Sequence, residues 1–121
     1  MTRRRILFID DEWLMREMMP ERLVTMGFDV VAVESGEEAI ETFRNDPEGF
    51  DLVLTDLLMP GMHGDTLSEK IHLIRSSVPV VLITGHPHLI TWERVRASGI
   101  CNMIPKTITT AELSEALRDA L

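Results

Sequence analysis

The chain has 121 residues, a length that suits one domain with one hydrophobic core. Its formal charge of -8 and its pI of about 4.9 disfavour nonspecific binding to nucleic acid or anionic membranes, whose phosphates would be repelled. No apolar run approaches the length of about 20 residues that spans a bilayer, and the single cysteine, Cys101, excludes an internal disulfide. We therefore expect residues 1–121 to form one cytoplasmic domain, without membrane insertion or direct contact with nucleic acid.

The first third of the chain predicts a strand, a helix and a second strand. Ile6–Ile9 is a short apolar run typical of a buried strand. Residues 13–26 carry apolar side chains at helical spacing, and Pro20 inside this stretch is expected to kink or split the helix. Gly27 ends the helix, and Phe28–Val33 follows as the second strand.

The middle of the chain repeats this order. Ser35 and Glu38 have the spacing of a capping box and predict the start of a helix that runs through Phe43. Leu52–Thr55 is a third apolar run, and residues 65–75 have a helical pattern. The alternation of strand and helix therefore continues.

The last third adds two more strands and two more helices. Val78–Ile83 and Ile100–Ile104 are apolar runs, and residues 88–98 between them are predicted to form a helix that a glycine ends. Thr109 and Glu112 form another capping box, which predicts a final helix.

Five strands that alternate with five helices predict a parallel sheet covered on both faces, because parallel neighbours need crossover helices. The strands are continuously apolar, which favours burial of both faces of the sheet. The predicted fold class is therefore a doubly wound α/β sandwich.

Polar residues follow the predicted strands at the edge where such sheets bind ligands. They are Asp10 and Asp11 after the first strand, Asp56 after the third, Thr84 after the fourth and Lys106 after the fifth. Three carboxylates, a hydroxyl and an ammonium are therefore expected to converge.

Three neighbouring carboxylates repel one another. At about 4 Å each pair of unit charges costs roughly 1 kcal/mol in water and about 4 kcal/mol at an effective dielectric near 20. Lys106 supplies only one compensating charge, so a hard divalent cation such as Mg²⁺ suits this all-oxygen site. An aspartate carboxylate can itself act as a nucleophile and form an aspartyl-phosphate, which makes phosphoryl transfer the predicted chemistry.

In these motifs the sequence resembles the receiver domain of two-component response regulators over nearly its whole length. The segments that carry the resemblance are Asp10-Asp11-Glu12, Asp56-Leu57-Leu58-Met59-Pro60 with Gly64, Thr84-Gly85, Ala97-Ser98-Gly99, and Lys106 followed by Glu112-Leu113. The resemblance implies a flavodoxin-like (βα)5 fold with strand order 2-1-3-4-5.

The resemblance also implies roles for these residues. Asp56 resembles the phosphoacceptor, which takes the phosphoryl group of a phosphohistidine on a sensor histidine kinase or a phosphotransfer protein. Asp11, Asp56 and the backbone carbonyl of Leu58 resemble direct Mg²⁺ ligands, while Asp10 resembles the residue that holds metal-bound water. Lys106 resembles the lysine that pairs with the acceptor and then with the phosphoryl oxygens.

Thr84 resembles the hydroxyl that moves toward the phosphoryl group and reshapes the face formed by the fourth helix, fifth strand and fifth helix (the 4-5-5 face). A homodimer through this face is one expectation. The domain is then a phosphoacceptor and not a classical enzyme, with at most slow self-phosphorylation and self-dephosphorylation. Leu58 and His86 occupy the positions that tune the lifetime of the phosphorylated state in this family.

Two departures from the family pattern affect these expectations. Thr107 follows Lys106 where the family has proline, and Pro105 precedes it, so the loop is expected to be trans and to place Lys106 differently. Met103 replaces the switch aromatic, so rotation of an aromatic ring cannot be the readout.

Three alternative functions compete with this interpretation of the sequence. A degenerate pseudo-receiver that acts only as an interaction module is kept open by the altered Lys106-Thr107 loop. A magnesium-dependent phosphatase of the haloacid dehalogenase type is disfavoured, because Leu58 stands where that family has an acid. A dinucleotide-binding protein is disfavoured because no Gly-x-Gly-x-x-Gly follows the first strand.

Overall fold

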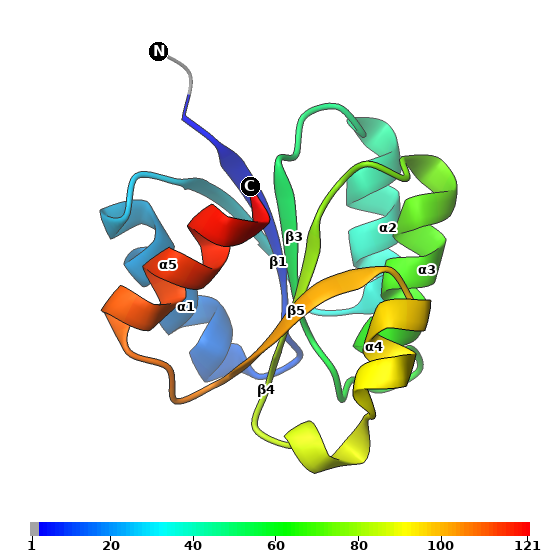
Figure 1. Ribbon diagram of the computed structural model, residues 1–121. Helices are drawn as coiled ribbons and strands as arrows, with labels where there is room; N and C mark the ends of the chain where they lie inside the picture. The colour runs from blue at the N-terminus through cyan, green and yellow to red at the C-terminus, as the bar shows by residue number, and fades with distance from the viewer. Residues whose placement is uncertain (1–2) are drawn as a thin grey trace.

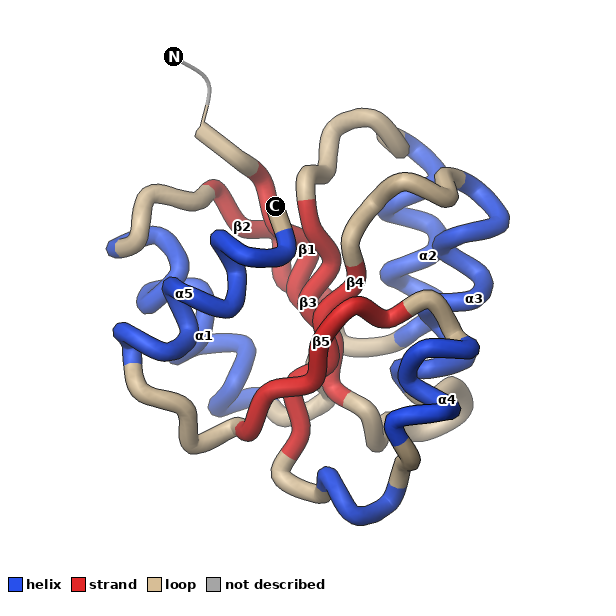
Figure 2. Tube along the Cα trace, in the orientation of Figure 1, coloured by secondary structure: helices blue, strands red, loops and turns tan. Residues whose placement is uncertain are grey.

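Five parallel strands form the central layer of the computed structural model, which describes residues 3–121 (Figures 1 and 2). Their order across the sheet is β2-β1-β3-β4-β5, as the resemblance implied. The strands are β1 (Arg5–Ile9), β2 (Asp29–Val33), β3 (Leu52–Asp56), β4 (Val80–Thr84) and β5 (Ile100–Pro105). All five therefore point the same way, and their carboxyl ends share one edge.

Helices cover both faces of this sheet, so the predicted fold class is confirmed. In Figure 1, α1 (Trp13–Thr25) and α5 (Thr110–Ala120) lie on one side of the sheet. The other side carries α2 (Gly36–Asn45), α3 (Gly64–Ile74) and α4 (Trp92–Ala97). Among residues 3–121, no helix combines the length and the apolar composition needed to cross a membrane.

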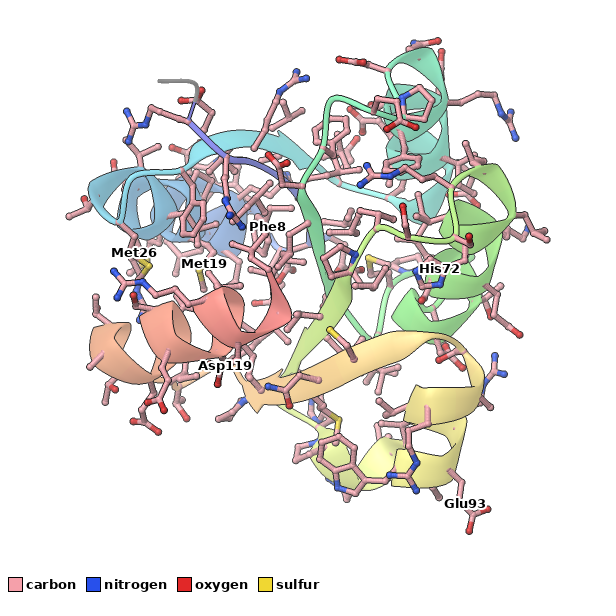
Figure 3. All side chains as sticks on the ribbon, turned by 45° about the horizontal axis from the view of Figure 1, so that its top comes forward. Phe8, Met19, Met26, His72, Glu93 and Asp119 are labelled. Atoms are coloured by element: carbon pink, nitrogen blue, oxygen red, sulfur yellow. The ribbon has the colours of Figure 1, made fainter. Side chains whose placement is uncertain are left out.

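Two hydrophobic cores, one on each face, hold the helices to the sheet. Successive side chains of a strand point to opposite faces, so Phe8 packs with Met19 beneath α1 and α5 (Figure 3). Its neighbour Leu7 packs with Phe43 and Phe50 on the other face, where the two phenylalanine rings stack 5.9 Å apart. Burial on both faces explains why the strands are continuously apolar.

Within the described residues, only the hydroxyl half of each predicted capping box forms, since the Glu38 carboxylate accepts from the N–H of Glu34 (3.3 Å) and the Glu112 carboxylate from the Thr109 hydroxyl (2.7 Å). The Ser35 hydroxyl accepts a hydrogen bond from the N–H of Glu38 (3.2 Å) at the start of α2. Thr109 does the same for Glu112 (3.2 Å) at the start of α5. These hydroxyls satisfy backbone donors that the first turn of a helix leaves free.

The helix predicted over residues 88–98 is wrong in its first part. Pro87–Leu89 forms only a single 3-10 turn, η1, and Ile90 then adopts an extended backbone. A new helix, α4, begins at Trp92 because the Thr91 hydroxyl caps it by accepting from the N–H of Arg94 (3.1 Å). The segment after β4 is therefore largely a loop beside the carboxyl edge of the sheet.

Pro20, which was expected to kink or split the first helix, does not split it, because α1 runs without interruption from Trp13 to Thr25. Proline removes one hydrogen bond of the helix. Met19 and Leu23, on either side of it, are buried in the core. We attribute the continuity of the helix to this packing.

Candidate functional site

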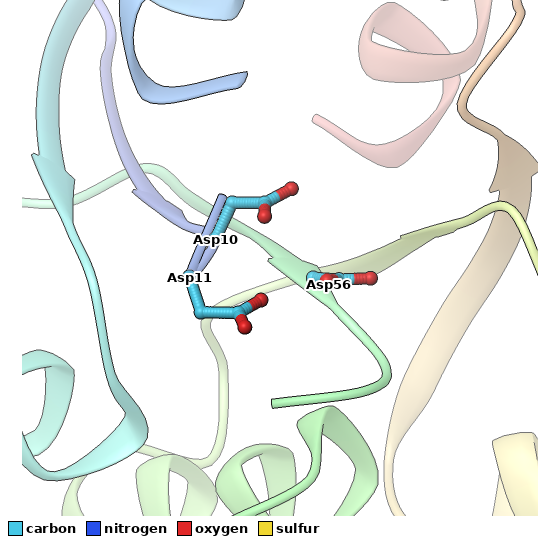
Figure 4. Close-up of side chains that lie close together, drawn as sticks. All are labelled: Asp10, Asp11 and Asp56. Atoms are coloured by element: carbon cyan, nitrogen blue, oxygen red, sulfur yellow. The ribbon is translucent and has the colours of Figure 1, made fainter. Parts of the chain in front are cut away.

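Three aspartates meet at the carboxyl edge of the sheet (Figure 4). Asp10 and Asp11 directly follow β1, and Asp56 is the last residue of the neighbouring strand β3. One carboxylate oxygen of each residue lies within 4.8 Å of the other two. Parallel strands bring these residues together, although 45 positions separate Asp11 from Asp56 in the sequence.

Asp10 is fully buried, and its two oxygens have different surroundings. Oδ1 accepts a hydrogen bond from the N–H of Glu12 (2.9 Å). Oδ2 has no hydrogen-bond partner among the described residues; Lys106 Nζ lies 3.1 Å away, but not in a hydrogen-bonding geometry. Burial raises the pKa of Asp10, and the Glu12 hydrogen bond and the charge of Lys106 offset part of this effect.

Asp56 is also buried, and one of its oxygens is fixed by the chain itself. Oδ1 accepts a hydrogen bond from the N–H of Leu57 (2.8 Å), and Oδ2 lies 3.4 Å from Lys106 Nζ. Burial, with the charge of Asp10, raises the pKa of Asp56 to about 6, although Lys106 acts in the opposite direction. The carboxylate is thus costly to ionise while the site lacks further positive charge.

Lys106 supplies the positive charge that faces these carboxylates. Its ammonium lies 2.7 Å from Glu12 Oε1, 3.1 Å from Asp10 Oδ2 and 3.4 Å from Asp56 Oδ2. Burial lowers the pKa of Lys106, but the hydrogen bond to Glu12 and the charges of Asp56 and Asp10 outweigh burial and raise it. The lysine therefore carries a full positive charge at neutral pH.

The loop after Lys106 is trans, as expected for a bond to Thr107, because the described residues contain no cis peptide bond. The trans loop nevertheless leads Lys106 to the acidic residues. The backbone N–H of Lys106 donates to the carbonyl of Thr84 (3.2 Å) and continues the pairing of β5 with β4. The replacement of proline therefore does not keep the ammonium out of the site.

Glu12 is a site residue to which the sequence analysis assigned no role. It stands directly after the acidic pair and is the N-cap of α1, but its side chain makes no capping hydrogen bond. Its carboxylate instead contacts Lys106, 94 positions away in the sequence. Its place next to Asp11 was the available signal, but the contact itself depends on the fold.

A cavity of about 300 Å³ opens onto this group of charges. Its lining residues come from the loops after β1, β3, β4 and β5: Asp11, Glu12, Asp56, Leu58, Gly85, His86 and Lys106. Thr84 is buried just beneath this lining, and its hydroxyl accepts a hydrogen bond from the N–H of His86 (2.9 Å). In this state, therefore, the Thr84 hydroxyl is engaged by the loop that follows it.

Of the three residues predicted to tune or transmit the switch, the structure brings two to this cavity. Leu58 and His86 both line the cavity, and His86 is exposed. Met103 lies in β5, is half-buried, and packs against the core on the side of α2, α3 and α4. It therefore contacts the protein interior as an ordinary apolar side chain.

The aspartate group fits a hard divalent cation. Its donors are carboxylate oxygens, which Mg²⁺ prefers. The buried Asp10 Oδ2 lies 3.1 Å from the Lys106 ammonium but accepts no hydrogen bond from the described residues, and burying an acceptor without a hydrogen bond is costly. A bound cation would remove this cost and also the repulsion among Asp10, Asp11 and Asp56.

The fold and this acidic edge agree with a comparison of the chain with known families. The response regulator receiver domain family matches residues 6–118. The chain belongs to this family. As a receiver domain, it belongs to the domains of two-component signalling proteins.

Individual relatives agree with the receiver assignment. The transcriptional regulatory protein GlrR of Escherichia coli (strain K12) is 29% identical over 116 residues, which cover 96% of this chain. This receiver domain spans only 26% of the length of GlrR.

Two solved structures are similar over almost their whole length. The response regulator protein TrrA of Thermotoga maritima in complex with Mg²⁺-BeF is 29% identical with a TM-score of 0.88, and the match covers 98% of this chain and 99% of that chain. A chain in the complex of the histidine kinase ThkA with TrrA matches at 29% identity and a TM-score of 0.85. The match covers 98% of this chain and 98% of that chain.

Proposed function

We propose that this receiver domain, residues 1–121, is a signalling switch that accepts a phosphoryl group on Asp56 with the help of Mg²⁺. The observation that carries this proposal is the convergence of Asp10, Asp11 and Asp56 within 4.8 Å, beside the ammonium of Lys106. The cavity above Asp56 gives a donor access to the acceptor. The match to TrrA, which was solved with Mg²⁺-BeF, supports the same chemistry.

The residues of this chain would act mainly by positioning and by neutralising charge. A carboxylate oxygen of Asp56 forms a bond to phosphorus while the phosphorus–nitrogen bond of a phosphohistidine breaks. The electron pair of that bond returns to the histidine nitrogen. The Leu57 N–H holds Asp56 Oδ1 in place, and the Lys106 ammonium stabilises the negative charge of the phosphoryl oxygens.

Asp11, Asp56 and the backbone carbonyl of Leu58 would hold the cation directly, and Asp10 would bind its water. Bound Mg²⁺ supplies positive charge that offsets the aspartates and the incoming phosphoryl group. The lack of a hydrogen bond to Asp10 Oδ2 among the described residues supports this assignment, because a water held by the cation would give this oxygen a donor.

Phosphorylation would act as a population shift between two conformers. The phosphoryl group adds charge of about -1.5 to -2 and new acceptor oxygens. To donate to them, the Thr84 hydroxyl has to move toward Asp56, and because its oxygen accepts from the N–H of His86, this movement would change the loop that leads to α4. The 4-5-5 face, formed by α4, β5 and α5, would carry this change, with Met103 as a flexible packing residue.

The proposed phosphoryl donor is a sensor histidine kinase or a phosphotransfer protein. The complex of ThkA with TrrA, a similar receiver structure, supports a kinase partner. A homodimer through the 4-5-5 face is a further proposal, supported by Trp92 of α4, which is 49% exposed. The cytoplasmic location stays a prediction.

The first experiment is a titration with beryllofluoride, a phosphoryl analogue, with and without Mg²⁺, followed by NMR shifts. We expect saturable, magnesium-dependent binding that moves signals of Thr84 and of the 4-5-5 face, and loss of binding in Asp56→Asn. Sedimentation of the same samples tests the homodimer.

The negative outcomes of this titration separate the alternative functions. A folded protein that does not bind beryllofluoride would be a pseudo-receiver, a domain that acts only as an interaction module because the Lys106-Thr107 loop has disabled its site. Steady release of phosphate from a phosphate ester would instead indicate a phosphatase of the haloacid dehalogenase type, which also uses a strand-end aspartate.

Leu58 and His86 are proposed to set the lifetime of phosphorylated Asp56, since both line the cavity. Leu58 is apolar and cannot orient a water molecule for hydrolysis. We expect Leu58→Asn to change the rate of decay of the phosphorylated protein in a pulse-chase assay. Unchanged decay would remove Leu58 from this role.

A further inference from the structure

The contact of Lys106 with Glu12 is closer than its contacts with the two buried aspartates. The ammonium lies 2.7 Å from Glu12, against 3.1 Å from Asp10 and 3.4 Å from Asp56. Only the contacts with Glu12 and Asp56 have hydrogen-bond geometry, and the Glu12 contact is the shorter of the two. Lys106 is therefore drawn toward the start of α1.

The backbone around Glu12 explains why its side chain can reach the lysine. The N–H of Glu12 is bonded to Oδ1 of Asp10, which fixes the residue beside the acidic pair. As the N-cap of α1, Glu12 has an extended backbone, and its carboxylate is not used to cap the helix. The carboxylate is thus free to extend over the cavity, whose lining it shares with Asp56.

We propose that Glu12 is a positioning residue that holds the Lys106 ammonium on the α1 side of the site in the unphosphorylated protein. This inference rests on the proposed phosphorylation of Asp56. A phosphoryl group on Asp56 then has to draw the lysine away from Glu12, so the two anions compete for one cation. Glu12 thereby sets how strongly the resting state resists conversion to the active state.

The exposure of the partners makes this competition reversible. The Glu12 side chain is 59% exposed, whereas that of Lys106 is 17% exposed. An ion pair with one solvated partner contributes little free energy and can exchange, whereas a charge-assisted bond to phosphoryl oxygens is stronger. The lysine therefore leaves Glu12 when Asp56 is phosphorylated, and returns to it when the phosphoryl group is lost.

The composition of the chain allows a direct test of the resting contact. Lys70 and Lys106 are the only lysines, so a protein labelled with 13C at lysine Cε gives two side-chain signals. We expect Glu12→Gln to shift the Lys106 signal and to leave that of Lys70, which lies on α3, unchanged. Glu17→Gln is the matched control, because it removes the same charge from the exposed side of α1 and should shift neither signal.

The second measurement is the affinity for beryllofluoride at saturating Mg²⁺. We expect Glu12→Gln to bind about two- to fivefold more tightly than the wild type, the factor that a partly exposed ion pair commonly gives. Glu17→Gln should bind like the wild type. Glu12→Asp keeps the charge but is shorter by one methylene, so we expect it also to bind more tightly, because it loses its reach to Lys106.

Each contrary result overturns a different claim. If Glu12→Gln leaves the Lys106 signal or the affinity unchanged while the wild type binds beryllofluoride, the role of Glu12 is refuted and the proposed function stands. If Glu12→Asp binds like the wild type, the gain in Glu12→Gln reflects lost repulsion, and the positioning role is again refuted. If neither the wild type nor any variant binds, the proposed function fails, and this inference fails with it.

Discussion

Charged side chains have different surroundings at the amino and carboxyl edges of the sheet, where the strands begin and end. At the amino edge two arginines meet acceptors, and the first, Arg75, donates to the carbonyls of Pro47 (2.9 Å) and Phe50 (2.6 Å). Arg5 pairs with Asp46 at 3.2 Å, and its guanidinium also lies 4.6 Å from the centre of the Phe50 ring. These contacts tie the loop before β3 to β1 and to the end of α3.

At the carboxyl edge the charges do not balance. The carboxylates of Asp10, Glu12 and Asp56 lie within 3.4 Å of the single ammonium of Lys106, and Asp11 adds a further carboxylate beside Asp10 and Asp56. Burial raises the pKa of both Asp10 and Asp56, and one Asp10 oxygen lacks a hydrogen-bond partner among the described residues. The protein therefore loses stability at the edge where it would bind a cation.

This contrast teaches where the chain is built for stability and where it is built for ligands. The charged groups of Arg5 and Arg75 at the amino edge are satisfied within the protein, so their removal should destabilise it. At the carboxyl edge the carboxylates lack enough positive charge around them, so removal of one carboxylate should stabilise the metal-free protein. The same kind of substitution is thus expected to have opposite signs at the two edges.

The largest expected effect comes from Asp56→Asn. In the metal-free protein at pH 8 we expect the free energy of unfolding to rise by about 2 to 3 kcal/mol, as a carboxyl pKa raised from 3.8 to about 6 implies. Urea unfolding in the presence of EDTA measures this. Asp51→Asn is the matched control at the other end of β3, where the carboxylate accepts a hydrogen bond from the N–H of Arg5 (2.8 Å). This substitution should not raise the free energy of unfolding.

The pH dependence of stability sharpens the same test. Because the pKa of Asp56 is higher in the folded than in the unfolded protein, folding binds protons between about pH 4 and pH 6. The stability that protonated Asp56 contributes to the folded protein is therefore fully present below about pH 4. It is lost as the pH rises through about 6. A metal-free Asp56→Asn protein with the same pH profile as the wild type would contradict this account.

A smaller effect of opposite sign is expected for Arg75→Ala. The substitution leaves the carbonyls of Pro47 and Phe50 without their charged donor, and we expect a loss of about 2 kcal/mol in urea unfolding. Arg3→Ala serves as the control, because Arg3 is exposed where it bonds the carbonyls of Val24 and Gly27, and it should cost less than about 1 kcal/mol. If both variants lose the same free energy of unfolding, burial does not decide how much these arginine hydrogen bonds contribute to stability.

Much of the fold could be predicted from local patterns. The strand positions follow from continuous apolar runs, and the starts of α2 and α5 follow from hydroxyls at Ser35 and Thr109. The loop after β4 could not be predicted in this way. The apolar spacing of residues 88–98 satisfied a helical pattern, but the break at Ile90 and the cap at Thr91 divide it.

The site was partly accessible to the same reasoning. Ligands bind at the carboxyl ends of parallel strands. From the sequence alone, this rule predicts that Asp10, Asp11, Asp56 and Lys106 lie together. It said nothing of Glu12, because a glutamate at the start of a helix is usually solvated or a helix cap. Nor did it place the Thr84 hydroxyl against the N–H of His86.

The sequence by itself determined the order of strands and helices, the buried faces and the residue types at the carboxyl edge, because these depend on periodicity and on short-range capping. Only the tertiary structure decided which charges meet and at what distance. Contacts such as Glu12 with Lys106 join residues 94 positions apart. Their geometry depends on strand register, loop path and burial, which no local pattern encodes.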